Sequence, residues 1–216
     1  MKKTIIFVAT FFIMGCTQTA PNDISHLKEL LEKPFHTTTQ TTQQGNITQI
    51  NTLDDTETEI NHIILTSKDP LLTAWLEENL AHYAPKYLYA LALRKAYHKA
   101  PIEETFFWQL AADLRSRADG SLCKDEYVMQ YATVLAMEYN PSERYSDKEK
   151  QKLFANDPAT IMRKVVAWDN QHPQSYPPNW FCQSGHAVST LETFPKAEWE
   201  QRRKDFKQKY TASAFK

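Results

Sequence analysis

Glycine is scarce in this sequence, with four residues among 216. Apart from Gly15, the glycines stand singly at Gly45, Gly120 and Gly185. Loops that cradle the phosphates of a nucleotide need clustered glycines, because the backbone must approach the ligand closely. The scarcity excludes the nucleotide-binding classes that depend on such loops, so we expect no nucleotide ligand.

Clusters of metal-binding side chains are lacking as well. Seven histidines occur, and no two have the i, i+4 spacing of a zinc-protease helix. The acids between Asp119 and Glu126 (DGSLCKDE) do not alternate as they do in a calcium loop, so helix capping is their expected role. We therefore predict no metal site and no cofactor.

A strong charge of one sign is also missing. The chain has 25 Lys and Arg residues against 26 Asp and Glu residues, which gives a net charge of −1. Basic residues concentrate only between Lys196 and Lys209, where acids are interleaved, a pattern typical of a solvated helix face. Nothing in the charge pattern indicates a nucleic-acid partner.

The first sixteen residues, MKKTIIFVATFFIMGC, are the most distinctive stretch present. Lys2 and Lys3 precede an apolar run from Ile5 to Met14, an order typical of a secretory signal peptide. Ten apolar residues are too few to span a bilayer core of about 30 Å, which needs about 20 helical residues. We expect residues 1–15 to be a cleaved signal peptide.

The residues Ile13-Met14-Gly15-Cys16 resemble the lipobox of bacterial lipoproteins. The resemblance implies cleavage before Cys16 by signal peptidase II, diacylglycerol on its thiol and a further fatty acid, such as palmitate, on its amine. Two or three acyl chains hold a protein firmly on a membrane, whereas one chain does not. Thr17 in place of Asp implies, within this family, sorting to the outer membrane with the body facing the periplasm. An ordinary signal peptide with an incidental cysteine is the alternative.

Two cysteines remain beyond Cys16, at Cys123 and Cys182. An even pair in the oxidising periplasm favours a disulfide, and two cysteines without nearby Cys or His pairs make a poor zinc site. Closing a loop of about 59 residues would stabilise the fold by ~4 kcal/mol on the chain-entropy estimate. Two reduced, buried thiols are the alternative.

The chain divides into a lipidated N-terminal segment, residues 16–58, and a helical domain, residues 59–216. Asp23 to Lys33 has helical spacing of apolar residues and stops at a proline. Residues 34–58 are rich in Thr and Gln and poor in apolar side chains, so we expect a flexible tether with a span of about 25–30 Å. Residues 59–66 fit either a short strand or an entry segment, because periodicity does not decide between them.

Most of the remaining sequence indicates helices. Apolar periodicity predicts them at residues 85–99, 102–118, 122–139, 158–169 and 196–211. Pro70 and Pro158 each follow an aspartate at a helix start, and Ser146 with Glu149 matches a capping box. This order predicts an all-α fold, an irregular bundle of about six helices that includes a helical hairpin.

Residues 87–120 (YLYALALRKAYHKAPIEETFFWQLAADLRSRADG) carry a local resemblance. Small Ala90 and Ala92, a turn at Pro101 and an aromatic second helix with Trp108 resemble a single tetratricopeptide or Sel1-like hairpin. No second copy follows at this period, and repeat arrays need about three units, so we predict hairpin packing without a solenoid. Hairpins of these families bind protein segments, so the resemblance implies a protein partner.

Two short stretches offer a nucleophile. Ser25-His26-Leu27-Lys28 fits an S-x-x-K pattern but lacks the companion motifs of penicillin-binding enzymes. Ser184 and His186 are two residues apart, and that proximity supplies no third group to orient a base. We predict no catalytic residue, and the alternative is a small periplasmic hydrolase that acts near the cell wall through Ser184 and His186 or through scattered carboxylates.

The segment of residues 168–186 (WDNQHPQSYPPNWFCQSGH) is rich in proline and aromatic residues. In one interpretation, Trp180 and Phe181 form a small core beneath this loop. In the other, His172, Tyr176 and Trp180 form a binding surface on a loop stiffened by proline and the disulfide. We expect a non-catalytic protein-binding module with a periplasmic partner, for instance an immunity-type protein against an imported toxin or an accessory factor of envelope assembly.

Overall fold

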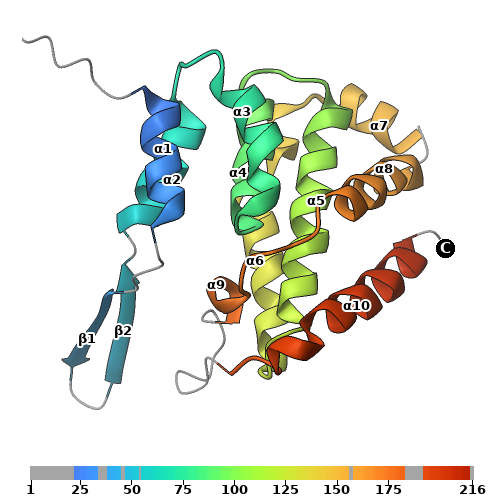
Figure 1. Ribbon diagram of the computed structural model, residues 1–216. Helices are drawn as coiled ribbons and strands as arrows, with labels where there is room; N and C mark the ends of the chain where they lie inside the picture. Colours follow the sequence, from blue (N-terminus) through green and yellow to red (C-terminus); the bar gives the residue numbers. More distant parts are fainter. Residues whose placement is uncertain are drawn as a thin grey trace, which may run out of the picture.

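The computed structural model describes residues 22–33, 38–44, 47–53, 55–155, 158–182 and 192–214. The expected signal peptide and Cys16 lie outside these residues, and so do Ser184 and His186. Helices build the packed body, which confirms the predicted all-α class (Figure 1). The described residues form ten α-helices instead of about six. The additional helices include α3 (Leu72–Asn79) and α9 (Asn179–Cys182), which are too short to show a periodic pattern.

Helices α4 (Lys86–Tyr97) and α5 (Ile102–Gly120) form a hairpin at the centre of the body (Figure 1). Apolar side chains of α4 are buried around its whole circumference, as expected for a helix without a polar face. In the turn, Lys99 has a φ of 56°, and the Ala100 N–H donates to the Lys95 carbonyl at 2.9 Å. This left-handed turn closes the end of α4, and the hairpin predicted from the sequence is confirmed.

Two hydrophobic clusters lie on either side of this hairpin. In the first, α1 (Asp23–Glu32), α2 (Asp55–Thr66) and α3 pack with α4 and with α6 (Met129–Glu138). In the second, α7 (Asp147–Ala155) and α8 (Pro158–Gln171) pack against α5. Among the described helices, none combines the length and the apolar character that a membrane span requires.

The core begins earlier in the chain than the predicted boundary at residue 59. Leu27 and Leu30 of α1 are buried in the first cluster, because the apolar face of this helix packs on α2 and α3. A contact of 2.7 Å joins His26 Nε2 to Glu59 Oε1 and links α1 to α2. The helix that the sequence places in the lipidated segment is therefore part of the helical body, and residues 59–66 belong to α2 instead of a strand.

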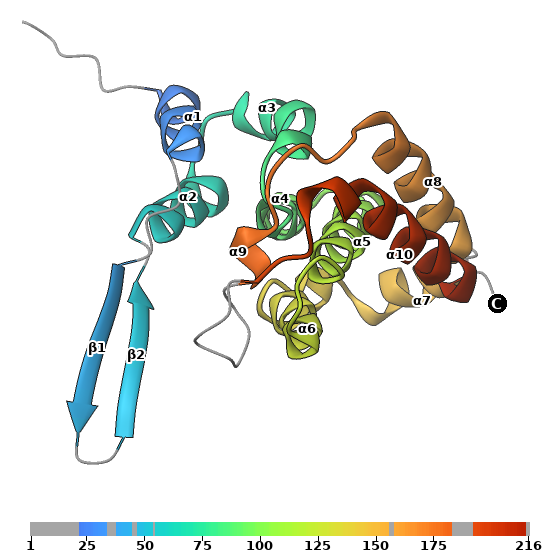
Figure 2. The same cartoon turned by 60° about the horizontal axis from the view of Figure 1, so that its bottom comes forward.

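The flexible tether predicted over residues 34–58 contains regular structure. Strands β1 (Thr38–Gln44) and β2 (Ile47–Leu53) pair antiparallel, with Thr38 opposite Leu53 and Gln44 opposite Ile47. The correction follows from the β-branched threonines, which favour extended backbone even where apolar residues are few. Figure 2 shows this hairpin projecting away from the helices, next to α2.

The predicted helix 122–139 begins later than expected. A 3₁₀ turn covers Glu126–Val128 and α6 starts at Met129. Before this turn, Cys123 forms an isolated antiparallel bridge with Thr193: the Lys124 N–H donates to the Glu192 carbonyl at 2.9 Å, and the Phe194 N–H donates to the Leu122 carbonyl at 2.8 Å. The sequence pattern cannot show this pairing, since the two segments are far apart in the chain.

The predicted capping box at the start of α7 is confirmed. The Ser146 N–H donates to Glu149 Oε2 at 2.8 Å, and the Glu149 N–H donates to Ser146 Oγ at 3.4 Å. The Ser146 hydroxyl also donates to Glu149 Oε2, at 2.6 Å, and this bond and the one from the Ser146 N–H lower the pKa of Glu149, because they stabilise its charged form. This local pairing is typical of a helix start, which explains why four residues of sequence were sufficient to predict it.

Candidate functional site

A cleft of about 830 Å³ lies between α8, the segment after it and α10 (Trp199–Ala214). Its size falls within the range of about 300–1,000 Å³ that is usual for ligand pockets. The lining mixes apolar and charged side chains, among them Val166, Asp169, Tyr176, Trp199, Arg203 and Lys207. α5 also contributes to the lining, through Leu114, and its charged groups Arg115 and Asp119 lie behind the cleft.

The spacing of residues on α10 determines which of them face the cleft. Glu200, Arg203 and Lys207 follow one another at intervals of three and four residues, which places them on one side of α10, and Lys196 lies in the 3₁₀ turn just before it. Arg203 is buried and Lys207 is half-buried, whereas Lys196 and Glu200 are exposed. The basic stretch predicted to be a solvated face is therefore solvated only in part.

Asp119, near the end of α5, is the acceptor at the centre of a buried network. Its carboxylate is fully buried and receives the Trp180 indole N–H at 2.9 Å and two donors of Arg203 at 3.0 and 2.8 Å. Gln174 Nε2 adds a fourth donor at 3.2 Å. Burial raises the pKa of Asp119, and Arg203 and Trp180 oppose that rise because both stabilise the charged form. The predicted capping role is wrong for Asp119, since its partners are side chains of distant segments, but it is confirmed for Asp125, whose Oδ1 accepts the Tyr127 N–H at 2.9 Å at the start of a 3₁₀ turn.

A second buried network joins α5, α8 and α10. Arg115 is fully buried, and its Nε donates to Asp169 Oδ1 at 2.7 Å. Another of its nitrogens donates to the Ala81 carbonyl at 2.8 Å, and its guanidinium lies 4.3 Å from the centre of the Trp168 ring. Lys207 Nζ reaches the other oxygen of the same carboxylate at 2.6 Å. One carboxylate therefore serves two cations.

Together the two networks hold an excess of positive charge. Arg115, Arg203 and Lys207 are three cations, and they face the two carboxylates Asp119 and Asp169. Burial lowers the pKa of Lys207, Arg115 and Arg203 lower it further by repulsion, and Asp169 partly offsets this. The floor of the cleft therefore carries a net positive charge, and its charged groups are held in place by hydrogen bonds and ion pairs.

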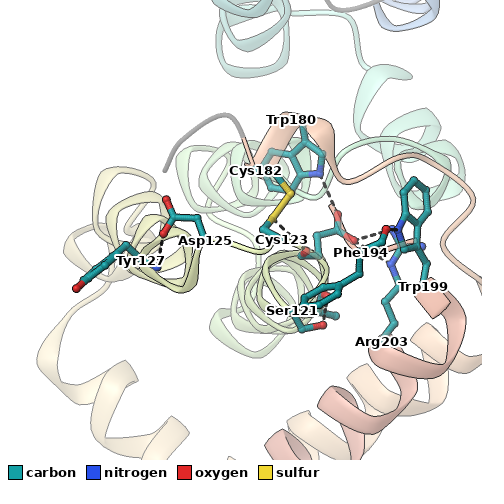
Figure 3. The surroundings of a disulfide bond; sticks show 11 residues. Ser121, Cys123, Asp125, Tyr127, Trp180, Cys182, Phe194, Trp199 and Arg203 are labelled. Carbon is teal, nitrogen blue, oxygen red and sulfur yellow. Dashed lines mark hydrogen bonds and ion pairs between the residues drawn. A yellow bond between two sulfur atoms is a disulfide. The ribbon is translucent and has the colours of Figure 1, made fainter. Parts of the chain in front are cut away.

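The disulfide lies beside these networks (Figure 3). Cys123 and Cys182 are bonded, with their Cα atoms 5.4 Å apart, which confirms the predicted pairing. The bond ties α9 to the chain just after α5, and Figure 3 shows Trp180 next to it and Arg203 reaching in from α10. The disulfide and the ion pair between Arg203 and Asp119 thus stabilise the same region of the protein, next to the cleft.

The three side chains predicted to form a binding surface have different environments. Trp180 is 6% exposed and packs with Phe181, so both are core residues as the structural interpretation predicts, but they belong to the first hydrophobic cluster and not to a separate small core. The ring Nδ1 of His172 lies 2.7 Å from the Trp168 carbonyl, and the ring stacks on Trp168. Only Tyr176 lines the cleft.

Tyr176 occupies a position between two cavities. It is half-buried and lines the main cleft as well as a smaller cavity of about 430 Å³ next to α1 and α2. Its hydroxyl accepts a hydrogen bond from Gln174 Nε2 at 2.6 Å. Burial and the nearby Asp119 carboxylate raise the pKa of Tyr176, so the phenol is neutral at physiological pH.

Sequence reasoning missed the residues that dominate this site. Arg203 and Asp119 are 84 positions apart, and Arg115 and Asp169 are 54 apart, so no short motif contains either pair. A weak signal was present in α5, where Arg115 and Asp119 continue at four-residue intervals the buried side of the helix that includes Ala111. Charged residues at such positions are rarely buried without partners. The sequence alone did not identify those partners.

Comparisons with known proteins assign no function to this cleft. No protein-family model matches the chain, and neither a curated protein nor a solved structure matches it. Among the described residues, no group of three or more His, Cys, Asp or Glu side chains is placed to hold a metal ion. The cleft, together with the lipobox and the cysteine pair in the sequence, is therefore the basis for a proposed function.

Proposed function

We propose that this chain is a lipid-anchored protein of the bacterial outer membrane that binds a protein partner in the periplasm. The lipobox at Cys16 supports the anchor, and the pair Cys123 and Cys182 suits an oxidising compartment. An immunity-type protein and an accessory factor of envelope assembly are two kinds of protein that would act in this way. Binding, without catalysis, is the activity proposed.

The proposal rests mainly on the hydrogen bonds and ion pairs that hold the walls of the cleft in place. Arg203 of α10 is bonded to Asp119 of α5, and it also donates to the carbonyls of Gln174 and Tyr176 at 3.3 and 3.1 Å. These contacts connect α10, α5 and the segment after α8 at one point. A preorganised cleft binds more tightly than a mobile one, because less conformational entropy is lost on association.

The anchor is tested on the native protein. We expect mass spectrometry of the chain purified from envelopes to find an N-terminal Cys16 that carries fatty acids, and the Cys16→Ser variant to carry none. A native chain that retains residues 1–15, or a bare Cys16, would contradict the anchor. This measurement is independent of any partner.

The binding site is tested with a variant that obstructs the cleft. Ser175 is exposed and lines the cleft, so Ser175→Trp should fill part of it without altering the buried networks. Gln151→Trp places the same bulk on exposed α7 and is the matched control. We expect the tagged, lipidated protein and the control to recover the same envelope protein, and Ser175→Trp to lose it. Equal recovery by both variants would rule out the cleft as the binding site.

A further inference from the structure

The rim of the cleft carries cations that have no partner among the described residues. Lys196 and Lys204 are exposed, and both line the cleft. The side-chain ammonium of neither one forms a hydrogen bond or an ion pair in the described part of the chain. Glu200 is the carboxylate that lines the cleft between them, and Asp169 lies deeper, already bonded to Arg115 and Lys207. The rim therefore adds positive charge to a floor that already has an excess of it.

The cleft also contains an acceptor that lacks a donor. Gln174 lines it, and its Oε1 is buried without a hydrogen-bond partner among the described residues. The orientation of this amide is determined by its other end, since Nε2 donates both to Asp119 Oδ1 and to the Tyr176 hydroxyl. Rotating the amide would set an oxygen against a carboxylate. Because this oxygen is buried, a ligand in the cleft does not reach it, and the charges at the rim are what the cleft offers.

We infer that the occupant of this cleft is an acidic peptide segment of the partner, an inference that rests on the proposed function. Asp or Glu side chains match Lys196 and Lys204, whose charged groups are exposed at the rim of the cleft. The remaining lining includes Tyr176 and Trp199, which offer apolar surface to the rest of a peptide. A free inorganic anion fits less well, because it fills little of about 830 Å³.

The test uses the full-length lipidated protein in micelles of a neutral detergent. The probe is a dye-labelled hexaglutamate peptide with blocked ends, and hexaglutamine of the same length is the neutral comparison. We expect fluorescence anisotropy to show binding of hexaglutamate that weakens as salt is raised, and no binding of hexaglutamine, because attraction between exposed charges is screened. Equal binding of the two peptides would overturn the inference.

Matched charge variants locate the effect. The pair Lys196→Gln and Lys204→Gln should weaken hexaglutamate binding by about fivefold or more, since each exposed ion pair contributes a modest share of the affinity. The pair Lys148→Gln and Lys209→Gln removes the same charge from exposed positions that do not line the cleft, and it should change affinity by less than about twofold. Equal weakening by both pairs would mean that the interaction is non-specific and would contradict the inference.

An anionic membrane is the competing occupant. Vesicles of phosphatidylglycerol, compared with neutral phosphatidylcholine vesicles, test it by flotation with the same variants. Binding to phosphatidylglycerol that depends on Lys196 and Lys204, without binding of hexaglutamate, would replace the peptide by a lipid surface. Failure of the proposed function gives a different result. If Cys16 proves to be bare, the anchor is absent but the binding of hexaglutamate remains. If the cleft instead captures a partner segment that contains no acidic residues, the proposed function stands and the inference of an acidic peptide fails.

Discussion

The substitution Arg203→Met tests the buried network at the cleft most directly. It removes both donors to the Asp119 carboxylate, which is fully buried, and leaves the indole N–H of Trp180 and the amide of Gln174. Breaking a buried ion pair by removing one partner typically costs about 3–5 kcal/mol, because the other charge stays buried. We expect a loss in the free energy of unfolding of about that size at pH 7, measured by urea unfolding followed by tryptophan fluorescence.

The pH dependence of this loss provides a second readout. Burial already raises the pKa of Asp119, and removing the opposing charge of Arg203 raises it further. A carboxyl group whose folded pKa exceeds its unfolded value of about 3.9 contributes stability that is present below that pH and is lost as pH rises through the folded pKa. The difference in stability between the variant and the original protein should therefore shrink as pH is lowered from 7 towards 5.

A neighbouring arginine is the control. Arg202 pairs with the exposed Glu198 at 2.9 Å and lies over the Phe194 ring, so Arg202→Met should cost about 1 kcal/mol or less. The double variant Arg203→Met with Asp119→Leu should recover much of the stability, since no buried charge is left unpaired. Equal losses for Arg202→Met and Arg203→Met, or a loss that does not change with pH, would refute the assignment of a buried ion pair.

Three further changes test the hairpin, the helix end and the disulfide, each by thermal or urea unfolding. Lys99→Gly should stabilise the protein by about 0.5–1 kcal/mol, because glycine adopts the φ of 56° without strain; an unchanged or lower stability would contradict this. Gly120→Ala should destabilise it by about 1–3 kcal/mol despite the better helix propensity of alanine, since the new methyl group would lie 2.8 Å from the Phe181 ring; a gain in stability would show that this contact relaxes freely. Replacing both bridged cysteines by serine should cost about 4 kcal/mol, and adding a reductant to the original protein should reproduce most of that loss; no effect of either would show that the bridge is absent in solution.

Local patterns account for the parts of the structure that were predicted correctly. The helix predicted at 158–169 is α8 (Pro158–Gln171), and the predicted hairpin is α4 with α5, because side chains three and four residues apart share a helix face whatever surrounds them. The capping box is likewise formed within four residues. These features depend on near neighbours in the chain, so the sequence contains the information they need.

The charged residues were misjudged for the same reason. Arg203 and Lys207 look like part of a solvated face, because the acids beside them in sequence could screen them. In the structure their partners are Asp119 and Asp169, on other helices. Trp180 was equally ambiguous, since an aromatic residue in a proline-rich loop suits a binding surface as well as a core.

The helical class, the capping box at the start of α7 and the even cysteine pair that forms the disulfide follow from the sequence alone, whereas α3 begins at Leu72 and not at the predicted start, Pro70. Tertiary structure alone decided that α1 belongs to the core, that Arg115 and Asp119 are buried, and that α10 closes a cleft. The physical reason is range: helix propensity and capping act within about one turn, whereas burial and ion pairing depend on which distant surfaces meet when the chain folds.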